Sequence, residues 1–145
     1  MRAIIQRVNK ASVSSDNQEI GSINSGLVVF LAIHQNDTQD MIEKIAEKIS
    51  KLRIFEDSDK KLNLSILDTG DEILLVSQFT LYADCTKGNR PSFIEAADPE
   101  KAEDYYQKCI MALRAKNIFV AIGKFKSSMQ MSLVNDGPTT IILDI

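Results

Sequence analysis

Two hydroxyl side chains are the first candidates for chemistry in this sequence. Ser77 and Thr80 begin and end the polar segment SQFT, which follows the apolar run EILLV. A serine or threonine hydroxyl attacks an ester only when a base or a lowered pKa activates it. The single histidine, His34, ends the run LVVFLAIH, so a Ser-His-Asp arrangement must include it. Two interpretations of His34 stay open: a catalytic base, or a partly exposed residue at a strand end.

Other kinds of site have little support in the sequence. The chain has no glycine-rich nucleotide loop and no pair of carboxylates at a convincing spacing, and Glu56, Asp57 and Asp59 are typical of a solvated turn. Cys85 and Cys109 lack the spacing of metal ligands and are interpreted as two reduced thiols. We therefore expect neither a metal site nor a cofactor.

Basic side chains gather beside glycines in two predicted loops. Lys87 and Arg90 lie in TKGNRPSF, and Lys124 and Lys126 lie in IGKFKSS. The net charge of −3 and the pI of about 5.2 argue against a protein that coats nucleic acid with a general basic surface. The two loops can either approach phosphates together or carry ordinary solvated charges.

Length and composition predict one compact domain, residues 1–145. The chain is 44% hydrophobic and 26% charged, which suffices for one real core, and it has no repeat and no linker-like run. Its first residues, MRAIIQRVNKASV, alternate between apolar and polar types, unlike a signal peptide or a membrane span. We therefore expect a cytoplasmic protein without a membrane partner.

Apolar runs predict the strands that must position these residues. A first pair, RAIIQRV and ASVSS, is followed by the buried strand LVVFLAI, and EILLVSQFTLYA is interpreted as one central strand that passes into the polar SQFT. Three further strands are predicted toward the end of the chain: IFVAI, MQMSLV and TTIILDI.

Two helices are predicted between these strands. Asp37 or Thr38 can cap the first, and Asp98 before Pro99 begins the second. Apolar residues at helical spacing give each helix one buried face: Ile42, Ile45, Ala46, Ile49 and Leu52 in the first, and Ala102, Tyr105, Tyr106, Cys109, Ile110 and Leu113 in the second. The pattern indicates an α/β domain whose sheets are covered by two helices.

The strongest turn signal is NDGP, residues 135–138, between the last two predicted strands. Taken alone, it predicts a hairpin. Together with IQRV, RIFED, LLVSQFTLYAD, GNRPSF and MQMSLVNDGPTT, however, it makes the chain resemble the D-aminoacyl-tRNA deacylases from end to end. That resemblance implies a compact three-layer β/β/α domain with barrel-like sheets, a homodimer, and cleavage of the ester between a D-amino acid and tRNA.

The resemblance also implies a role for the turn. The Gly137–Pro138 bond is expected to be cis, and its main-chain carbonyls to enter the site of the partner subunit, where an L side chain collides with them. Rejection of the L form also implies that glycyl-tRNA is cleaved, because glycine has no side chain. Arg7 is expected to hydrogen-bond near the Gly-Pro carbonyls and hold the loop, with the exposed end of an edge strand as the alternative. Asn135 and Met129 join the substrate-binding set.

The same resemblance implies that SQFT shapes the site and does not supply a nucleophile. Main-chain N–H groups of Phe79 and Thr80 are expected to stabilise the oxyanion, the tRNA 2′-hydroxyl to help activate water, and Ser77 and Gln78 to shape the pocket. A covalent nucleophile at Thr80 remains the rival mechanism. For the pocket wall the candidates are three aromatic residues, with core packing as the alternative: Phe79, Phe93 and Phe125.

The chain departs from the family pattern at a few positions. Ser127 and Ser128 stand where relatives place glycine or alanine and then aspartate, so no acid is available there, and Thr139 replaces a valine. Two other functions stay open: a non-catalytic RNA-binding module that uses the four basic loop residues, and a small-molecule esterase that depends on Thr80.

Overall fold

One six-stranded sheet forms the centre of the protein in the computed structural model, which describes residues 1–145. Its strands run in the order β2 (Gln18–Ile23), β1 (Arg2–Ser15), β3 (Gly26–Ala32), β6 (Glu72–Ser77) and β7 (Val120–Ile122). A sixth strand, β8 (Gln130–Asp144), pairs with β1. The β3–β6 and β6–β7 pairs are parallel, and the pairs that involve β1 are antiparallel.

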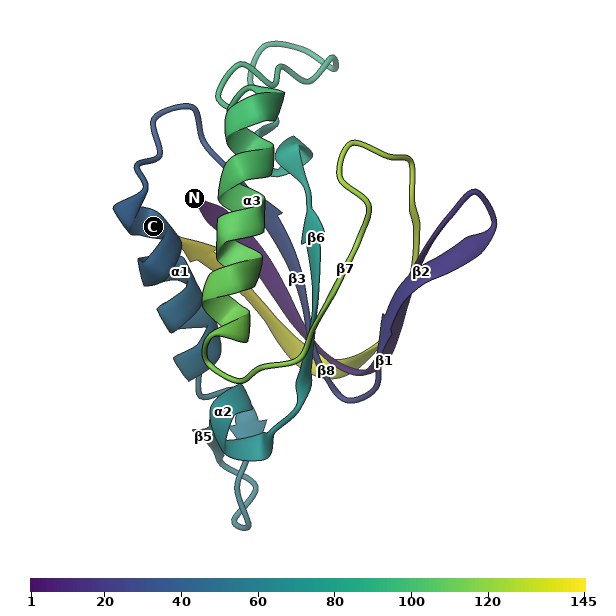
Figure 1. The fold of residues 1–145 in the computed structure, drawn as a ribbon, viewed down its shortest axis with the longest axis vertical. Helices are drawn as coiled ribbons and strands as arrows, with labels where there is room; N and C mark the ends of the chain where they lie inside the picture. The colour runs from purple at the N-terminus through teal and green to yellow at the C-terminus, as the bar shows by residue number, and fades with distance from the viewer.

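The long strand β1 organises this sheet. Residues 2–8 pair with β3, and residues 11–15 pair with β2. Nearly the whole strand also pairs with β8, from Arg2 opposite Asp144 to Ser14 opposite Gln130. The two predicted strands RAIIQRV and ASVSS are therefore one continuous strand, which curls the sheet into a nearly closed barrel (Figure 1).

Two apolar clusters divide the molecule into layers. The larger lies between the sheet and the helices α1 (Asp40–Lys51) and α3 (Pro99–Arg114), which Figure 1 shows side by side on one face. The smaller fills the inside of the curled sheet and consists of Val8, Ala11, Val13, Ile23, Val28, Leu74, Val76 and Ala121. This arrangement confirms the predicted three-layer α/β fold.

Helix α3 forms as predicted. The Asp98 side chain accepts a hydrogen bond from the Lys101 N–H at 2.9 Å, and Pro99 occupies the first turn. Its predicted apolar stripe is buried except for Tyr105, which is partly buried, and the hydroxyl of Tyr106 donates to the Leu75 carbonyl of β6 at 2.8 Å. This contact fixes the helix against the strand that leads to SQFT.

The predicted cap of α1 is wrong. The residue at the N-cap position is Gln39, whose side chain makes no capping hydrogen bond. Asp37 is buried and accepts hydrogen bonds from the Met1 ammonium and from the His34 N–H, both at 2.7 Å, while Thr38 bonds to the Asp40 carboxylate. The Asp37 carboxylate, which the local pattern assigned to the start of α1, thus binds the Met1 ammonium instead, a group that is distant in sequence.

The predicted strand EILLVSQFTLYA is also too long. β6 ends at Ser77, and Phe79–Tyr82 form the 3-10 helix η1. The structure contains further elements that the sequence reading did not include: β2, the hairpin β4 (Phe55–Glu56) and β5 (Leu62–Leu64), and α2 (Ile66–Thr69). No helix has the length and apolar character needed to cross a membrane.

NDGP does not form a hairpin. The strands predicted on either side of it are one strand, β8, and the motif bulges out of it. Val8 pairs with Asn135 and Gln6 with Thr140, so only Arg7 of β1 faces the four residues 136–139. The Gly137–Pro138 peptide bond is cis in the structure.

Candidate active site

A cavity of about 690 Å³ opens where β6 ends. Its wall combines the end of β6 and the start of η1 with the segment before α3, the first turn of that helix, and the segment between β7 and β8. The lining residues are mainly apolar: Val76, Ser77, Gln78, Phe79, Phe93, Ala96, Ala97, Pro99, Ala102, Phe125, Lys126, Ser127, Met129 and Met131. Of the predicted pocket residues, the structure thus brings together Ser77, Gln78, Phe79 and Met129.

The backbone turns sharply at SQFT. The Gln78 N–H still bonds to the Leu31 carbonyl of β3 at 2.8 Å, and the chain then leaves the sheet and begins η1. The first amides of a helix have no carbonyl within that helix to bond. The hydrogen bonds of turns and loops include Leu81 N–H to Gln78 O at 3.2 Å but none from Phe79 or Thr80. The N–H groups of these two residues therefore remain available as donors.

Thr80 lies apart from the other residues of SQFT. It is not among the lining residues, and its hydroxyl accepts a hydrogen bond from the Gln78 side-chain amide. Its role in the structure is thus to hold Gln78, which does line the cavity. No histidine or carboxylate lies in the cavity wall to take a proton from this hydroxyl.

Three phenylalanines line the cavity, as the sequence suggested. Phe79 is 53% exposed, and its ring meets the edge of Phe93 at a centroid distance of 5.1 Å. Phe125 lies 6.1 Å from the ring of Tyr106, so it also packs against the core. The exposed ring of Phe79, beside the partly buried Phe93, suits the stacking of a flat ligand such as a nucleic-acid base.

The cavity wall contains only one charged side chain, Lys126. This residue has a left-handed backbone conformation, with φ of 58°. Lys124 and Lys126 lie on the segment before β8, and Lys87 and Arg90 lie on the loop closed by the Asp84–Ser92 bridge. All four are exposed and none forms an ion pair, which leaves their charges free for an anionic partner.

Side chains that could move protons lie outside the cavity wall. His34 is partly exposed beyond it, with its Nε2 2.7 Å from the Glu95 carboxylate. Burial raises the pKa of the Tyr82 hydroxyl to about 12, and burial likewise raises the pKa of the Cys109 thiol to about 12. Both groups therefore stay protonated at neutral pH. Cys109 is a free thiol, and so is the exposed Cys85.

The NDGP bulge does not reach the cavity of its own chain, because residues 135–138 are absent from the lining. Gly137 and Pro138 are exposed, and the Asn135 amide oxygen accepts a hydrogen bond from Gln6 at 3.0 Å. The buried Arg7 holds the bulge from behind. Its Nε lies 2.7 Å from the Asp136 carboxylate in an ion pair without a well-aligned hydrogen bond.

This arrangement corrects the alternative for Arg7. The residue is only 6% exposed, so it is not the exposed end of an edge strand. Its guanidinium contacts the carboxylate of Asp136, which directly precedes Gly137, and Nη1 donates to the Ile54 carbonyl at 2.6 Å.

Sequence reasoning missed the small residues of the wall, Ala96, Ala97, Pro99 and Ala102. The one local signal near them was the Asp98-Pro99 helix start, which marks the first turn of α3 but not its position in the cavity wall. A second cavity, of about 540 Å³, lies elsewhere and is lined by residues such as Lys10, Glu72 and Phe119. None of the predicted site residues lines it.

Comparison with known proteins gives a consistent result. The model of the family described as D-Tyr-tRNA(Tyr) deacylase matches residues 4–144. Proteins named "D-aminoacyl-tRNA deacylase" from Thermotoga petrophila and Dictyoglomus turgidum are 50% and 51% identical over 144 residues, which is 99% of this chain and 97% and 92% of theirs. A solved structure named "c-Myc DNA Unwinding Element Binding Protein" is 42% identical, with a TM-score of 0.94 over 100% of this chain and 99% of its own.

Proposed function

This chain belongs to the D-Tyr-tRNA(Tyr) deacylase family, and from that premise we propose that it hydrolyses the ester of D-aminoacyl-tRNA in the cytoplasm. The products are free tRNA and the D-amino acid. The observation that carries the proposal is the cavity at the end of β6, which aromatic rings line without a histidine or a carboxylate and which lies at the start of η1, where the N–H groups of Phe79 and Thr80 are free. Such a wall suits a reaction that needs charge stabilisation and positioning.

The proposed mechanism uses the main chain of η1. Water attacks the ester carbonyl carbon, and the N–H groups of Phe79 and Thr80 donate to the oxygen as it becomes negative. Each such donor contributes about 2.7–4 kcal/mol to stabilising the transition state. The bond from carbon to the 3′ oxygen of the terminal adenosine then breaks. The neighbouring 2′-hydroxyl accepts the proton from water and passes its own proton to the leaving oxygen, so the protein needs no base.

Thr80→Ala is therefore expected to keep its deacylase activity within about tenfold of the wild type. The hydroxyl supports Gln78 from outside the cavity wall, whereas the donated N–H group stays in place. Single-turnover hydrolysis of D-tyrosyl-tRNA, with circular dichroism as the control for folding, measures the effect. A loss of several orders of magnitude in a folded variant establishes the covalent nucleophile instead.

For chirality we propose that the bulge at NDGP acts in trans. Gly137 and Pro138 are exposed on β8 and do not contribute to the cavity of their own chain. In a homodimer the bulge of one subunit then enters the cavity of the other, with main-chain carbonyls close to the α-carbon of the aminoacyl group. A rigid backbone wall excludes an L side chain by collision, which separates enantiomers more strongly than an apolar pocket separates ligands that differ by a methylene.

The tRNA body binds in this proposal through Lys126 of the cavity wall and three further exposed cations: Lys87, Arg90 and Lys124. Met129 contacts the aminoacyl end together with Asn135 of the partner subunit, and Phe79 and Phe93 stack on the terminal base. Phosphate contacts release counterions, so the affinity for tRNA falls as salt rises.

Hydrolysis assays on three matched substrates test the function and the filter together. We expect release of amino acid from D-tyrosyl-tRNA and glycyl-tRNA, and intact L-tyrosyl-tRNA, with enzyme at catalytic concentration. Equal cleavage of the D and L esters contradicts the proposed chirality filter. If glycyl-tRNA stays intact, the enzyme recognises the D side chain instead of rejecting the L side chain.

Two further outcomes identify the rival functions. Binding of tRNA without release of any amino acid identifies a non-catalytic RNA-binding module. Cleavage of free D- and L-aminoacyl esters, unaffected when hydrogen replaces the terminal 2′-hydroxyl of the tRNA substrate, identifies a small-molecule esterase.

A further inference from the structure

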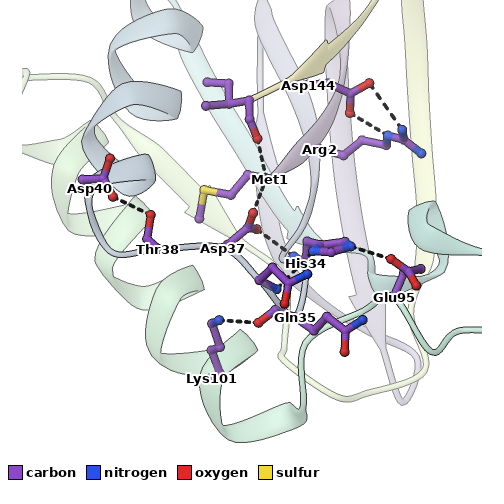
Figure 2. A network of polar contacts seen from close by, with 12 residues as sticks. Met1, Arg2, His34, Gln35, Asp37, Thr38, Asp40, Glu95, Lys101 and Asp144 are labelled. Carbon is purple, nitrogen blue, oxygen red and sulfur yellow. Dashed lines mark hydrogen bonds and ion pairs between the residues drawn. The ribbon is translucent and has the colours of Figure 1, made fainter.

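The single histidine of the chain lies directly behind two parts of the cavity wall. His34 follows β3, and its side chain is 21% exposed. Figure 2 shows its ring directed at Glu95, with Nε2 2.7 Å from the carboxylate oxygen. It does not line the cavity and so does not meet the substrate there. Its contacts nevertheless lead to the cavity from two sides.

On one side His34 holds the segment before α3. Main-chain hydrogen bonds join residues 33–35 to residues 95–97. The Gln35 N–H donates to Glu95 O at 3.0 Å, the Ala97 N–H donates to Ile33 O at 2.9 Å, and His34 and Ala96 form a β-bridge. This segment supplies part of the cavity wall: Phe93, Ala96 and Ala97. The hydrogen bond with Glu95 therefore secures that part of the wall.

On the other side His34 contacts η1. Its ring meets the ring of Tyr82 edge to face, at a centroid distance of 5.0 Å and an interplanar angle of 66°. Tyr82 is the last residue of η1, and Phe79, with its free N–H group, is the first. Arg2 covers the same tyrosine and donates to the Leu81 carbonyl at 3.1 Å. The imidazole thus bridges the donor segment and the aromatic wall.

The orientation of the imidazole ring is itself fixed. Nδ1 accepts a hydrogen bond from the Asn36 N–H at 3.1 Å, which leaves Nε2 to carry the proton that Glu95 accepts. The His34 N–H donates to Asp37 at 2.7 Å, and the Met1 ammonium binds the same carboxylate at 2.7 Å (Figure 2). If the ring turned away, it would lose the hydrogen bonds of its two nitrogens and its contact with Tyr82.

We propose that His34 is a positioning residue for the deacylase reaction. By joining Glu95 to Tyr82, it sets the distance between the N–H donors of η1 and the wall around Phe93, against which the substrate lies. The inference rests on the proposed function, in which these N–H groups donate to the oxygen of the reacting carbonyl. This role differs from both interpretations that the sequence left open, a catalytic base and a partly exposed residue at a strand end.

The test compares three substitutions that separate the two contacts. His34→Ala removes both, His34→Gln keeps a donor for Glu95, and His34→Phe keeps a ring against Tyr82. We expect His34→Ala to lower the single-turnover rate about tenfold while the affinity for uncharged tRNA changes less than about twofold. The glutamine and phenylalanine variants should each recover part of the rate. Lys101→Ala, which removes a 2.7 Å contact to the neighbouring Gln35 carbonyl, is the matched control and should keep the wild-type rate.

Hydrogen exchange supplies a readout that does not need activity. In His34→Ala the amides of Leu81 and Ala97, which bond to Gln78 O and Ile33 O, should exchange about tenfold faster, while amides in the centre of α3 stay unchanged. An unchanged rate and unchanged exchange in His34→Ala overturn the proposal. So does a loss of rate that the control shares. A wild type that fails to cleave D-aminoacyl-tRNA overturns the proposed function instead, and the exchange data still decide the positioning.

Discussion

Replacing Phe79 by proline is expected to slow deacylation about 10²–10³-fold relative to Phe79→Ala. Proline lacks the backbone N–H, so this substitution removes one of the two proposed oxyanion donors without touching a side-chain catalyst. The position tolerates proline because it is the first residue of η1 and the preceding Gln78 is not helical, with φ of −143° and ψ of 76°. Single-turnover rates with D-tyrosyl-tRNA give the ratio directly.

The alanine variant makes this test specific. Phe79→Ala loses the ring that stacks near Phe93 but keeps the N–H group, so it reports the aromatic contribution alone. Thermal unfolding checks that the proline variant keeps the wild-type fold. Equal rates for the two variants contradict the main-chain oxyanion hole and return attention to the hydroxyl of Thr80.

Arg7→Ala is expected to lower the ratio of D to L hydrolysis about 100-fold. Arg7 is the only residue of β1 opposite the bulge at NDGP, and its guanidinium lies 2.7 Å from Asp136 within that bulge. Without it, the bulge that we propose enters the partner's cavity has no buried anchor and admits the L side chain. Parallel time courses on D- and L-tyrosyl-tRNA measure the ratio.

Two companion variants sharpen the interpretation. Asp136→Asn leaves the Arg7 charge buried with Glu56 3.9 Å away, so it should also weaken the fold, by about 1–3 kcal/mol in urea unfolding. Arg53→Ala removes an arginine whose side-chain hydrogen bonds go only to Asn63, and it should leave the ratio unchanged. A wild-type ratio in folded Arg7→Ala shows that the bulge does not depend on this ion pair.

Local sequence patterns predicted most of the fold because the apolar residues that recur at helix or strand spacing are the ones that are buried. The stripe from Ala102 to Leu113 is buried apart from the partly buried Tyr105, and the Asp98-Pro99 signal marks the true start of α3. The predictions fail where contacts with residues distant in sequence determine the local structure. The pattern of EILLVSQFTLYA continues beyond Ser77, but the paired strand β3 ends at Ala32, so the chain loses its ladder and turns into η1. Similarly, Asp37 binds the Met1 ammonium instead of capping α1.

The site was predictable from sequence only as far as a family resemblance extends. SQFT and NDGP are recognisable strings, but nothing local shows that the hydroxyl of Thr80 lies outside the cavity wall. The partner of Arg7 could not be found either, because Asp136 is distant in sequence and meets it only through the pairing of β1 with β8. Alanines such as Ala96 and Ala97 carry no chemical signal, and only the fold brings them to the wall.

The pairing of β1 with β8 has a consequence for the newly made chain. Arg2 pairs with Asp144, so β1 lacks its β8 partner until β8 has been synthesised. Until then β1 carries an unpaired edge beside β2 and β3, and contacts of such long sequence separation form slowly. The bulge at NDGP is also set only at this step, since Arg7 stands on one strand and the bulge on the other. A chain whose synthesis stops before β8 therefore lacks the bulge that we propose as the chirality filter, even though it contains the residues of β6 and η1.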